Sequence, residues 1–292
     1  MLRGRRRPPA PGGTVSDTIT SLLELARETA VAAGQQLLSR GGRPQVVATK
    51  SSPTDVVTDA DRAAEELIRE RIGAARPGDR ILGEEGGETS AGDDAGGGGP
   101  GRVRWIVDPL DGTVNYLYGR PDWAVSIAAE LDGTVVAGAV FVPRREELFS
   151  AAAGSGAWLT ANGEPAVRLA CNTGVPLEAA LVATGFGYAA GRRLVQAEVL
   201  RVVLPRVRDI RRGGSAAVDL CSVASGTADA YYERGVNLWD IAAGGLIAAE
   251  SGALVAGLRG RPPGASMTIA AAPGLLRDLH DLLAATDAER DA

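Results

Sequence analysis

Apolar residues recur at spacings of three and four along the first quarter of the chain, a pattern typical of helices with one buried face. Between Ser16 and Ser39 this spacing predicts an amphipathic helix, whose apolar positions are Ile19, Leu22, Leu23, Ala26, Ala30, Ala33 and Leu37. A second helix is expected over about 59–75, where the apolar face consists of Ala64, Leu67, Ile68 and Ile72. Thr58 and Asp61 precede that face with a Thr-x-x-Asp start, which resembles a capping box.

The middle of the chain has the pattern of strands. Short apolar runs, separated by Gly, Pro and Asp, occur at 103–107, 123–131, 134–142 and 147–153. Asp132-Gly133 lies between two of these runs and marks a hairpin turn. The segment therefore predicts an antiparallel sheet.

After about residue 165 the pattern changes to short apolar strands that alternate with helical stretches, which is typical of an α/β arrangement. Strands are expected near 180–184, 229–233, 253–256 and 267–271. Helices are expected near 191–205, 214–225, 239–250 and 273–285. We therefore divide the chain into a tail (1–15), an N-terminal α+β half with an antiparallel sheet (16–165) and a C-terminal α/β half (166–292).

Two segments lack any pattern of buried residues. The basic start, Arg3 to Arg7, is followed by a stretch rich in Pro and Gly in place of an apolar signal segment, so we expect a disordered tail. The stretch between Glu88 and Arg102 is rich in glycine and has nothing apolar enough to pack, so we expect a mobile surface loop. Neither segment predicts a folded element.

Composition narrows the class of protein. The 292 residues are 45% hydrophobic and 23% charged, which is typical of a globular protein with a sizeable core. A net charge of -5 argues against nucleic acid as a partner. No apolar run approaches the roughly 18 residues that a membrane helix needs, so we expect no membrane contact. The two cysteines, Cys171 and Cys221, do not indicate a disulfide framework, and a cytoplasmic location fits best.

Candidate chemistry begins at Asp108 and Asp111, which end an apolar strand and are separated by Pro109 and Leu110. Two carboxylates at one strand end, with a backbone carbonyl nearby, form the oxygen-rich set that Mg²⁺ prefers. If the N–H groups of Gly112 and Thr113 open a helix, they favour a phosphate beside the metal. The alternative is a plain strand-to-turn element, since Asp, Pro and Gly are all common turn residues.

Three further polar segments change the balance between these alternatives. Glu84 and Glu85 follow the apolar pair Ile81-Leu82, so two more acids stand at a strand end. Asp240 begins an apolar helix, where a favourable N-terminal charge is the structural alternative to a ligand. The polar segment from Lys50 to Asp61 has the composition of a loop. Each segment has a structural explanation by itself, but these three segments and the segment of Asp108 and Asp111 occur together.

These segments, in this order and spacing, resemble the inositol monophosphatase family within the lithium-sensitive, Mg²⁺-dependent phosphatases. The resemblance rests on Gly-Glu-Glu, on Trp-Ile-Val-Asp-Pro-Leu-Asp-Gly-Thr-x-Asn-Tyr and on Trp-Asp-Ile-Ala-Ala-Gly-Gly, and it runs from about residue 16 to the end. It implies a layered αβαβα sandwich of the sugar phosphatase type, with the metal site between the two halves. It also implies a homodimer.

The resemblance implies two or three Mg²⁺ ions per site. Glu84, Asp108 and the carbonyl of Leu110 would bind the first ion, and Asp108, Asp111 and Asp240 the second, so that Asp108 bridges the pair. A third, weaker ion would lie near Glu84. This ligand set accounts for an acidic site that contains no histidine.

The same resemblance assigns roles in the reaction. Thr113, oriented by Asp61, would position and help to deprotonate the attacking water, and Glu84, through the first ion, also belongs to the catalytic set. Glu85 would assist from behind the metal ligands, and Lys50 would add a mobile positive charge over the site. The N–H groups of Gly112 and Thr113 would contact phosphate. Three residues would face the alcohol part of the substrate, namely Asp111, Ala216 and Glu233.

The function implied is Mg²⁺-dependent hydrolysis of a small phosphorylated polyol or sugar, above all myo-inositol 1-phosphate. Other substrates of the superfamily stay open as alternatives, because specificity resides in the surrounding loops: histidinol phosphate, fructose 1,6-bisphosphate and 3′-phosphoadenosine 5′-phosphate. A non-catalytic regulator that acts through its basic tail is an alternative of a different class.

Overall fold

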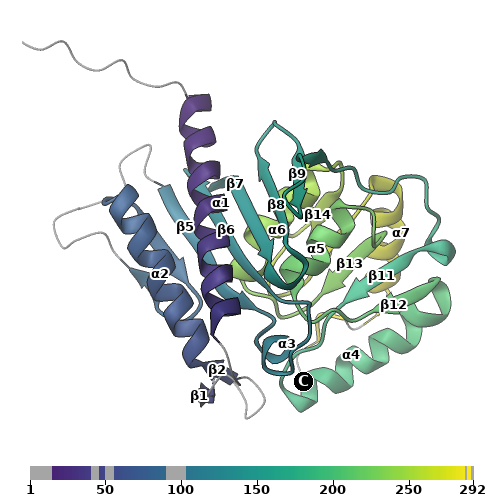
Figure 1. Cartoon of the computed structure of the whole chain (residues 1–292). Helices are drawn as coiled ribbons and strands as arrows, with labels where there is room; N and C mark the ends of the chain where they lie inside the picture. Colours follow the sequence, from purple (N-terminus) through teal and green to yellow (C-terminus); the bar gives the residue numbers. More distant parts are fainter. Residues whose placement is uncertain (1–14, 41–45, 50–55, 90–102, 287, 291–292) are drawn as a thin grey trace, which may run out of the picture.

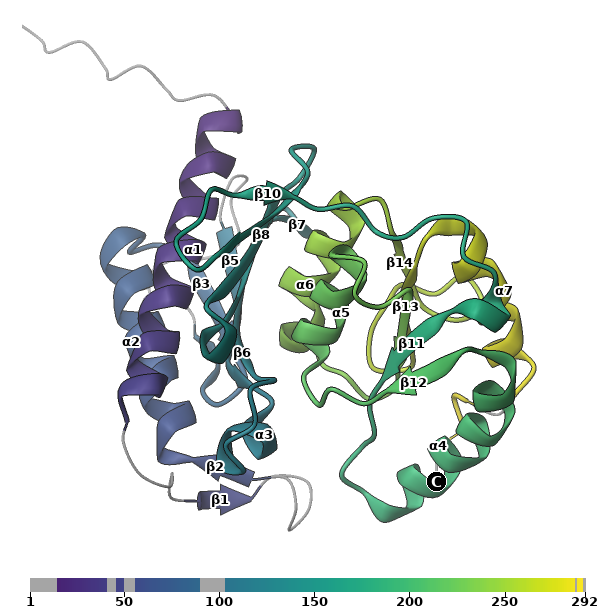
Figure 2. The ribbon, with the colours of Figure 1, turned by 45° about the vertical axis from the view of Figure 1, so that its right-hand side comes forward.

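The structure is a computed structural model that describes residues 15–40, 46–49, 56–89, 103–286 and 288–290. The predicted tail, apart from Val15, lies outside these residues, as do Lys50 and most of the glycine-rich stretch. The described elements form five alternating layers of helices and sheets (Figures 1 and 2). The predicted αβαβα sandwich is therefore confirmed.

The first two layers are a helix pair and a large sheet. The helices are α1 (Val15–Ser39) and α2 (Asp59–Ala75). The sheet has the strand order β10-β9-β8-β7-β6-β5-β3-β4. Its strands are β3 (Arg80–Gly83), β4 (Gly87–Thr89), β5 (Val103–Asp111), β6 (Ala124–Leu131), β7 (Thr134–Val142), β8 (Glu147–Ala152), β9 (Ala157–Ala161) and β10 (Val167–Arg168).

The remaining layers are a central helix pair, a second sheet and an outer helix pair, seen side by side in Figure 2. The central helices are α5 (Ala216–Ala224) and α6 (Leu238–Glu250), and the outer ones are α4 (Ala190–Val203) and α7 (Pro273–Ala284). The second sheet has the order β12-β11-β13-β15-β14. Its strands are β11 (Leu181–Thr184), β12 (Asp209–Arg211), β13 (Ala230–Glu233), β14 (Leu254–Ala256) and β15 (Thr268–Ala271). Outside the layers lie the small hairpin of β1 (Val46–Thr49) and β2 (Val56–Thr58) and the short helix α3 (Thr113–Leu117).

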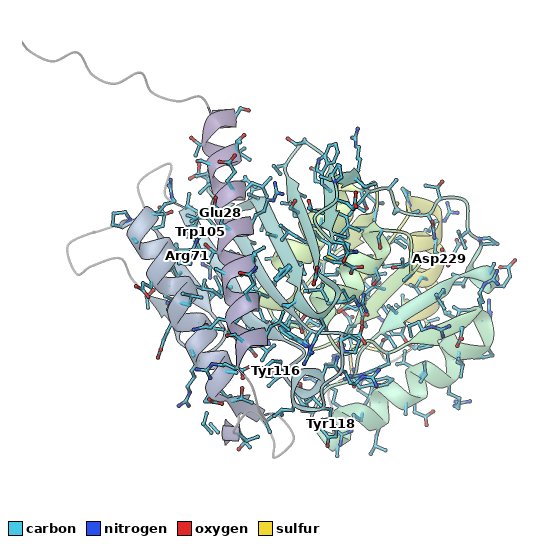
Figure 3. All side chains as sticks on the ribbon, viewed as in Figure 1. Glu28, Arg71, Trp105, Tyr116, Tyr118 and Asp229 are labelled. Carbon is cyan, nitrogen blue, oxygen red and sulfur yellow. The ribbon has the colours of Figure 1, made fainter. Side chains whose placement is uncertain are left out.

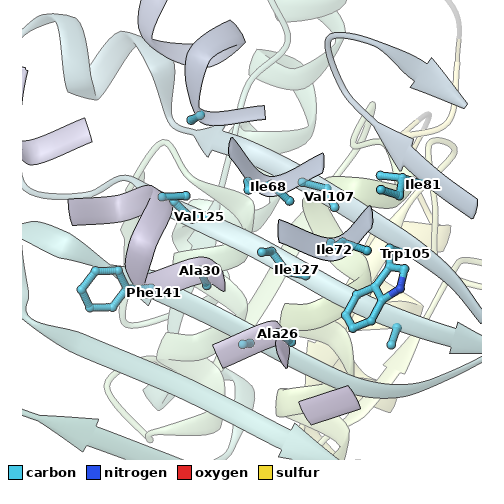
Figure 4. Close-up of a cluster of buried hydrophobic side chains, with 14 of the residues drawn as sticks. Ala26, Ala30, Ile68, Ile72, Ile81, Trp105, Val107, Val125, Ile127 and Phe141 are labelled. Atoms are coloured by element: carbon cyan, nitrogen blue, oxygen red, sulfur yellow. The ribbon is translucent and has the colours of Figure 1, made fainter. Parts of the chain in front are cut away.

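A separate apolar cluster fills each gap between neighbouring layers. Alternate residues of β5 divide between two of them, because successive side chains of a strand point to opposite faces. Trp105 and Val107 pack under α1 and α2, whereas Ile106 packs against the central helices. Figure 4 shows the first cluster, to which Trp105 of β5, Ile72 of α2 and Ala26 of α1 belong. Burial of β5 on both faces explains why its sequence is an almost continuous apolar run.

The predicted helices are found within one or two residues of their expected ends, and Asp132-Gly133 forms the turn between β6 and β7 with positive φ at both residues. The capping box of Thr58 and Asp61 is confirmed. The predicted antiparallel sheet is confirmed for β5 to β8, and β3, for which no pairing was predicted, runs parallel to β5. The interpretation of the segment before Asp61 as a loop was wrong for its last part, since β2 and the first turn of α2 occupy it.

The division into two halves stays a prediction. The last strand of the large sheet, β10, lies just beyond the expected boundary at residue 165 and pairs with β9. The central helices contact both sheets, since α6 packs against β7 and β8 while α5 packs against β13. Residues from both sides of the boundary therefore meet around the central layer.

Candidate active site

A cavity of about 590 Å³ opens where the end of β5 meets the beginnings of α5 and α6 and the end of β13. Most residues predicted for the site line this cavity: Glu84, Asp108, Leu110, Asp111, Gly112, Thr113, Ala216, Glu233 and Asp240. Tyr116 and Tyr118, labelled in Figure 3, mark the adjacent helix α3 at the foot of the molecule. The tertiary structure thus brings together segments from five different parts of the chain.

The end of β5 presents Asp108 and Asp111 through an irregularity in its pairing. The register with β6 shifts between these two residues, where Pro109 has no N–H to donate to the neighbouring strand. The backbone N–H of Leu110 instead donates to Oδ1 of Asp108 over 3.0 Å. The buried Leu110 side chain anchors this bend, so both carboxylates are held at the same strand end.

The parallel pairing of β3 and β5 places Glu84 beside Asp108. Gly83 is in register with Val107, and the N–H of Glu84 donates to the carbonyl of Val107 over 3.3 Å. Asp240 reaches the same space from the first turn of α6, where its Oδ2 accepts from the N–H of Asn237 over 2.6 Å. Four carboxylates therefore line one cavity, and no histidine is among the described residues that line it.

Burial and mutual repulsion dominate the electrostatics of these acids. Desolvation, with the charges of Glu84, Asp111 and Asp240, raises the pKa of Asp108 well above its usual range. Desolvation, with Asp111 and Glu84, likewise raises the pKa of Asp240. Burial also raises the pKa of Asp111 to about 6, against hydrogen bonds that lower it. Such a group of anions is stabilised when a cation enters it.

The donor set fits Mg²⁺. Carboxylate and carbonyl oxygens are the ligands of hard cations, and the described residues that line the cavity include no softer sulfur or imidazole donor. Among the described residues no group of three or more acidic, histidine or cysteine side chains is placed to hold a metal ion by itself. Mg²⁺ needs no such group, because it keeps several waters and takes few carboxylates together with substrate oxygens.

Asp111 is held by the first turn of α5, a support that the sequence analysis did not identify. The hydroxyl of Ser215 and the N–H of Ala217 both donate to Asp111 Oδ2, each over 2.7 Å. Ser215 is also the N-cap of α5, since its Oγ accepts from the N–H of Val218. The helix was predicted from residue 214, so Ser215 fell inside it, although Ser is a preferred N-cap residue and was the available signal for this cap.

Thr113 and Asp61 form the predicted hydroxyl–carboxylate pair. Thr113 Oγ1 lies 3.0 Å from Asp61 Oδ1 and 3.2 Å from the carbonyl oxygen of Leu110, and donates its proton within this group. The other oxygen of Asp61 accepts from the N–H and the hydroxyl of Thr58. Desolvation raises the pKa of Asp61 from its usual value. Asp61 therefore lies behind Thr113, fixed by the cap of α2.

Gly112 occupies a position that only glycine fits. Its φ is 95°, in the left-handed region, and a Cβ at this residue would lie 3.0 Å from the carbonyl oxygen of Asp122 and 3.3 Å from that of Gly214. Asn115, in the short helix that follows, donates to the carbonyl of Gly213 over 2.9 Å. These contacts hold the loop of Gly213 and Gly214, which precedes α5, against the segment that follows β5.

Glu233 lines the same cavity from the end of β13. The hydroxyl of Tyr231 donates to its Oε2 over 3.0 Å, while burial raises the pKa of Glu233 to about 7. A carboxyl group with such a pKa can accept or donate a hydrogen bond near neutral pH. This property suits a residue that faces substrate hydroxyls.

Two predicted residues and two further residues complete the description of the site. Lys50 lies outside the described residues, and Glu85 is half-buried behind the site with its N–H bound to Glu65. Arg192 and Arg212 line the cavity but were not predicted. Neither has a sequence signal, because a single Arg in a helix or loop is usually an exposed residue.

This chain is similar to several known proteins. Residues 18–290 match the sequence model of the inositol monophosphatase family. The inositol-1-monophosphatase SuhB of Mycobacterium tuberculosis is 51% identical over 246 residues, 83% of this chain and 83% of that protein. The Nus factor SuhB of Pasteurella multocida is 36% identical over 263 residues, 88% of this chain and 94% of that protein. The solved structure of Mycobacterium tuberculosis SuhB has a TM-score of 0.76 at 42% identity and covers 93% of this chain and 98% of that one.

In the part of the chain that the structure describes, every helix is too short or too polar to cross a membrane.

Proposed function

Because the chain belongs to the inositol monophosphatase family and is a phosphatase of that family, we propose that it hydrolyses small phosphate monoesters, above all myo-inositol 1-phosphate, with Mg²⁺. The proposal rests on one observation. Four carboxylates share a cavity with a hydroxyl–carboxylate pair and with Glu233. A metal-assisted phosphoryl transfer needs these three kinds of group together.

The metal ligands are proposed as follows. Glu84, Asp108 and the carbonyl of Leu110 would hold one Mg²⁺, and Asp108, Asp111 and Asp240 a second. A third ion would share Glu84. When bound, such ions lower the pKa of a water and neutralise phosphate charge. The shared cavity and the raised pKa values of Asp108, Asp111 and Asp240 support this assignment.

The protein groups around the phosphate have separate tasks. Thr113 would hold the attacking water through its hydroxyl, and Asp61 would accept a proton through that hydroxyl. The N–H groups of Gly112 and Thr113 would donate to phosphate oxygens, which the left-handed turn at Gly112 permits. Glu233 and Ala216, with Asp111, would face the alcohol that leaves. Glu85 and Lys50 stay predictions as assisting residues.

Metal removal tests this function. Phosphate release from myo-inositol 1-phosphate is expected to require Mg²⁺, to fall to background in excess chelator, and to recover when Mg²⁺ is restored. A colorimetric phosphate assay on the purified chain measures all three. Full activity in excess chelator contradicts the metal mechanism. A panel with histidinol phosphate and 3′-phosphoadenosine 5′-phosphate at fixed Mg²⁺ ranks the alternative substrates.

Two arginines favour a second candidate substrate that carries another anionic group, such as fructose 1,6-bisphosphate. Arg192 reaches from α4 to Gly235, where a Cβ would lie 2.2 Å from its Nη1. Arg212 lies near Asp111 and Glu233, since its charge lowers the pKa of both. Among the described residues neither arginine forms an ion pair with an acid. Unpaired guanidinium groups beside the cavity suit a second phosphate better than polyol hydroxyls.

The substitution Arg192→Gln separates these substrates. We expect kcat/KM for fructose 1,6-bisphosphate to fall about 10- to 100-fold, the effect of losing a hydrogen bond between charged groups, while the value for myo-inositol 1-phosphate changes little. Arg201→Gln, on the same helix but exposed, is the matched control. An equal loss on both substrates would remove the argument for a second anion.

The remaining expectations stay predictions: a homodimer, lithium sensitivity, a cytoplasmic location and the absence of nucleic acid as a partner. One relative is named a Nus factor, and this name is the reason to keep a non-catalytic regulator as an alternative function. We favour catalysis, because a scaffold has no need to keep Glu84, Asp108, Asp111 and Asp240 around one cavity with Thr113.

A further inference from the structure

One buried acid near the site belongs to none of the groups described so far. Glu65 lies on α2 four residues after Asp61, and it is only 3% exposed. Its carboxylate points at the turn that joins β3 to β4. Oε2 accepts from the N–H of Glu85 over 2.8 Å, and Oε1 accepts from the N–H of Gly86 over 2.9 Å. Glu65 therefore holds the backbone directly after Glu84.

Arg69 completes this arrangement from the next turn of α2. Its Nε donates to Glu65 Oε1 over 2.7 Å. Its Nη2 donates to the carbonyl of Gly87 over 2.7 Å, and its Nη1 donates to the hydroxyl of Thr89 over 2.9 Å. Arg69 thus satisfies the buried Glu65 charge and binds strand β4, which follows the turn.

The glycines that flank the two acids of the turn allow this close approach. A Cβ at Gly83 would lie 2.5 Å from Glu65 Oε1, and one at Gly86 would lie 2.7 Å from the same atom. Neither glycine has a positive φ, so the requirement is for space and not for an unusual backbone conformation. The pattern Gly-Glu-Glu-Gly therefore matches a turn that a buried carboxylate touches on both sides.

The turn is also the place where Glu84 enters the cavity, directly after the residue pair that aligns β3 with β5. A shift of this turn changes the distance between Glu84 and Asp108. Groups that orient metal ligands from behind affect metal affinity even though they do not touch the ion.

We propose that Glu65 and Arg69 are positioning residues that fix the turn of residues 83–87 and so hold Glu84 in place as a ligand of the first Mg²⁺. The inference rests on the proposed function in one respect, because it takes Glu84 as a metal ligand. It goes beyond that function by assigning a task to two side chains that contact neither the metal nor the substrate. It also gives α2 a double role, since Asp61 on the same helix holds Thr113.

The substitution Glu65→Gln tests this inference, with Glu66→Gln as the matched control. Both change one glutamate of α2 to glutamine, but Glu66 is exposed. The glutamine at position 65 keeps the volume, loses the charge that pairs with Arg69, and turns a donor toward one of the two N–H groups. Calorimetric titration of the metal-free protein with Mg²⁺ is expected to show affinity weakened about 10- to 100-fold in Glu65→Gln and unchanged in Glu66→Gln.

Two further measurements separate positioning from a general loss of structure. At saturating Mg²⁺ the kcat of Glu65→Gln is expected to return to within about threefold of the original, because the chemical groups are all present. In chelator, amide hydrogen exchange of residues 84–89 is expected to be faster in Glu65→Gln than in Glu66→Gln. Unchanged Mg²⁺ affinity in a folded Glu65→Gln protein overturns the proposal, as does an equal loss in the control.

If Glu65→Gln does not fold, a substitution in the turn itself tests the inference. Gly86→Ala keeps the side chains of Glu65 and Arg69 but places a methyl group 2.7 Å from the carboxylate and 2.9 Å from the guanidinium, so the turn and this pair must move apart. It is expected to weaken Mg²⁺ binding, while Gly73→Ala, with open space around it, does not. Failure of the proposed function looks different. A chain that binds Mg²⁺ but releases no phosphate from any substrate rejects the phosphatase reaction, while the calorimetric comparison still decides the role of Glu65.

Discussion

Replacing Asp108 with asparagine should lower kcat/KM for phosphate release by at least about 10³-fold, the upper range for loss of one preorganised electrostatic group. Asp108 is the proposed bridge between two ions, and its side chain is 1% exposed. An amide keeps the shape and the oxygen that accepts from Leu110, but it removes the charge that would attract both ions. Activity at rising Mg²⁺ and the Mg²⁺ affinity measure this effect.

The same substitution should act on stability in the opposite direction when the metal is removed. Burial and the neighbouring acids raise the pKa of Asp108 above its ordinary value of 3.8. Below that value the carboxyl is protonated in both the folded and the unfolded chain. As the pH rises, the unfolded chain ionises first, so the free energy of unfolding falls until the pH passes the pKa of the folded state. Asparagine at this position does not ionise, so it removes this loss in the free energy of unfolding.

In chelator near pH 7, Asp108→Asn should therefore melt at a higher temperature than the original protein, by about 2 °C for each kcal/mol of repulsion removed. At pH 4 the difference should shrink. Asp278→Asn, an exposed residue of α7, provides the control for an equal change of net charge. A lower melting temperature for Asp108→Asn in chelator at both pH values would mean that the Asp108 carboxylate stabilises the metal-free fold, which contradicts the expected repulsion.

Replacing Thr113 with valine should lower kcat by about 10²- to 10⁴-fold, the usual contribution of a positioned proton-transfer group. Valine matches threonine in shape but lacks the hydroxyl that lies 3.0 Å from Asp61. Mg²⁺ affinity should change little, because the side chain of Thr113 is not a proposed ligand. Steady-state kinetics and calorimetry together separate the two effects.

Three variants accompany this test. Thr113→Ser restores the hydroxyl and should recover most of the rate, whereas Thr134→Val, at an exposed end of β7, should leave it unchanged. The double variant Asp61→Asn with Thr113→Val should be no slower than the more damaged single variant, because the two residues act as one unit. Additive losses would mean that Asp61 and Thr113 work separately.

Most of the fold could be predicted because a helix or strand records its buried face in the period of its apolar residues. The positions expected to be buried in α1, such as Leu22, Ala26 and Ala30, are fully buried. The pattern could not reveal that β3 pairs in parallel with β5, since pairing direction depends on how the chain crosses between strands. Short strands such as β12 were missed because three residues have no recognisable period.

The acids of the candidate site could be predicted because strand ends, proline and glycine leave a local signature around Asp108 and Asp111. Their order along the chain carried the resemblance to a family. Their supports could not be predicted in the same way. Ser215 holds Asp111 from a position 104 residues further along the chain, and only the packing of α5 beside β5 creates that contact.

The sequence by itself determined the helices, strands β5 to β8 of the large sheet and the acidic character of the site, because local periods and motifs specify buried faces and strand ends. The layered arrangement and the candidate ligands followed from the resemblance to a family. Only the tertiary structure decided which side chains hold those ligands in place. Glu65 and Glu66 are identical neighbours in the sequence, yet one is buried against the turn of Glu84 and the other is exposed. The physical reason is that their environments come from β3 and β4, about twenty residues further along the chain, and no local pattern records how closely α2 packs against that turn.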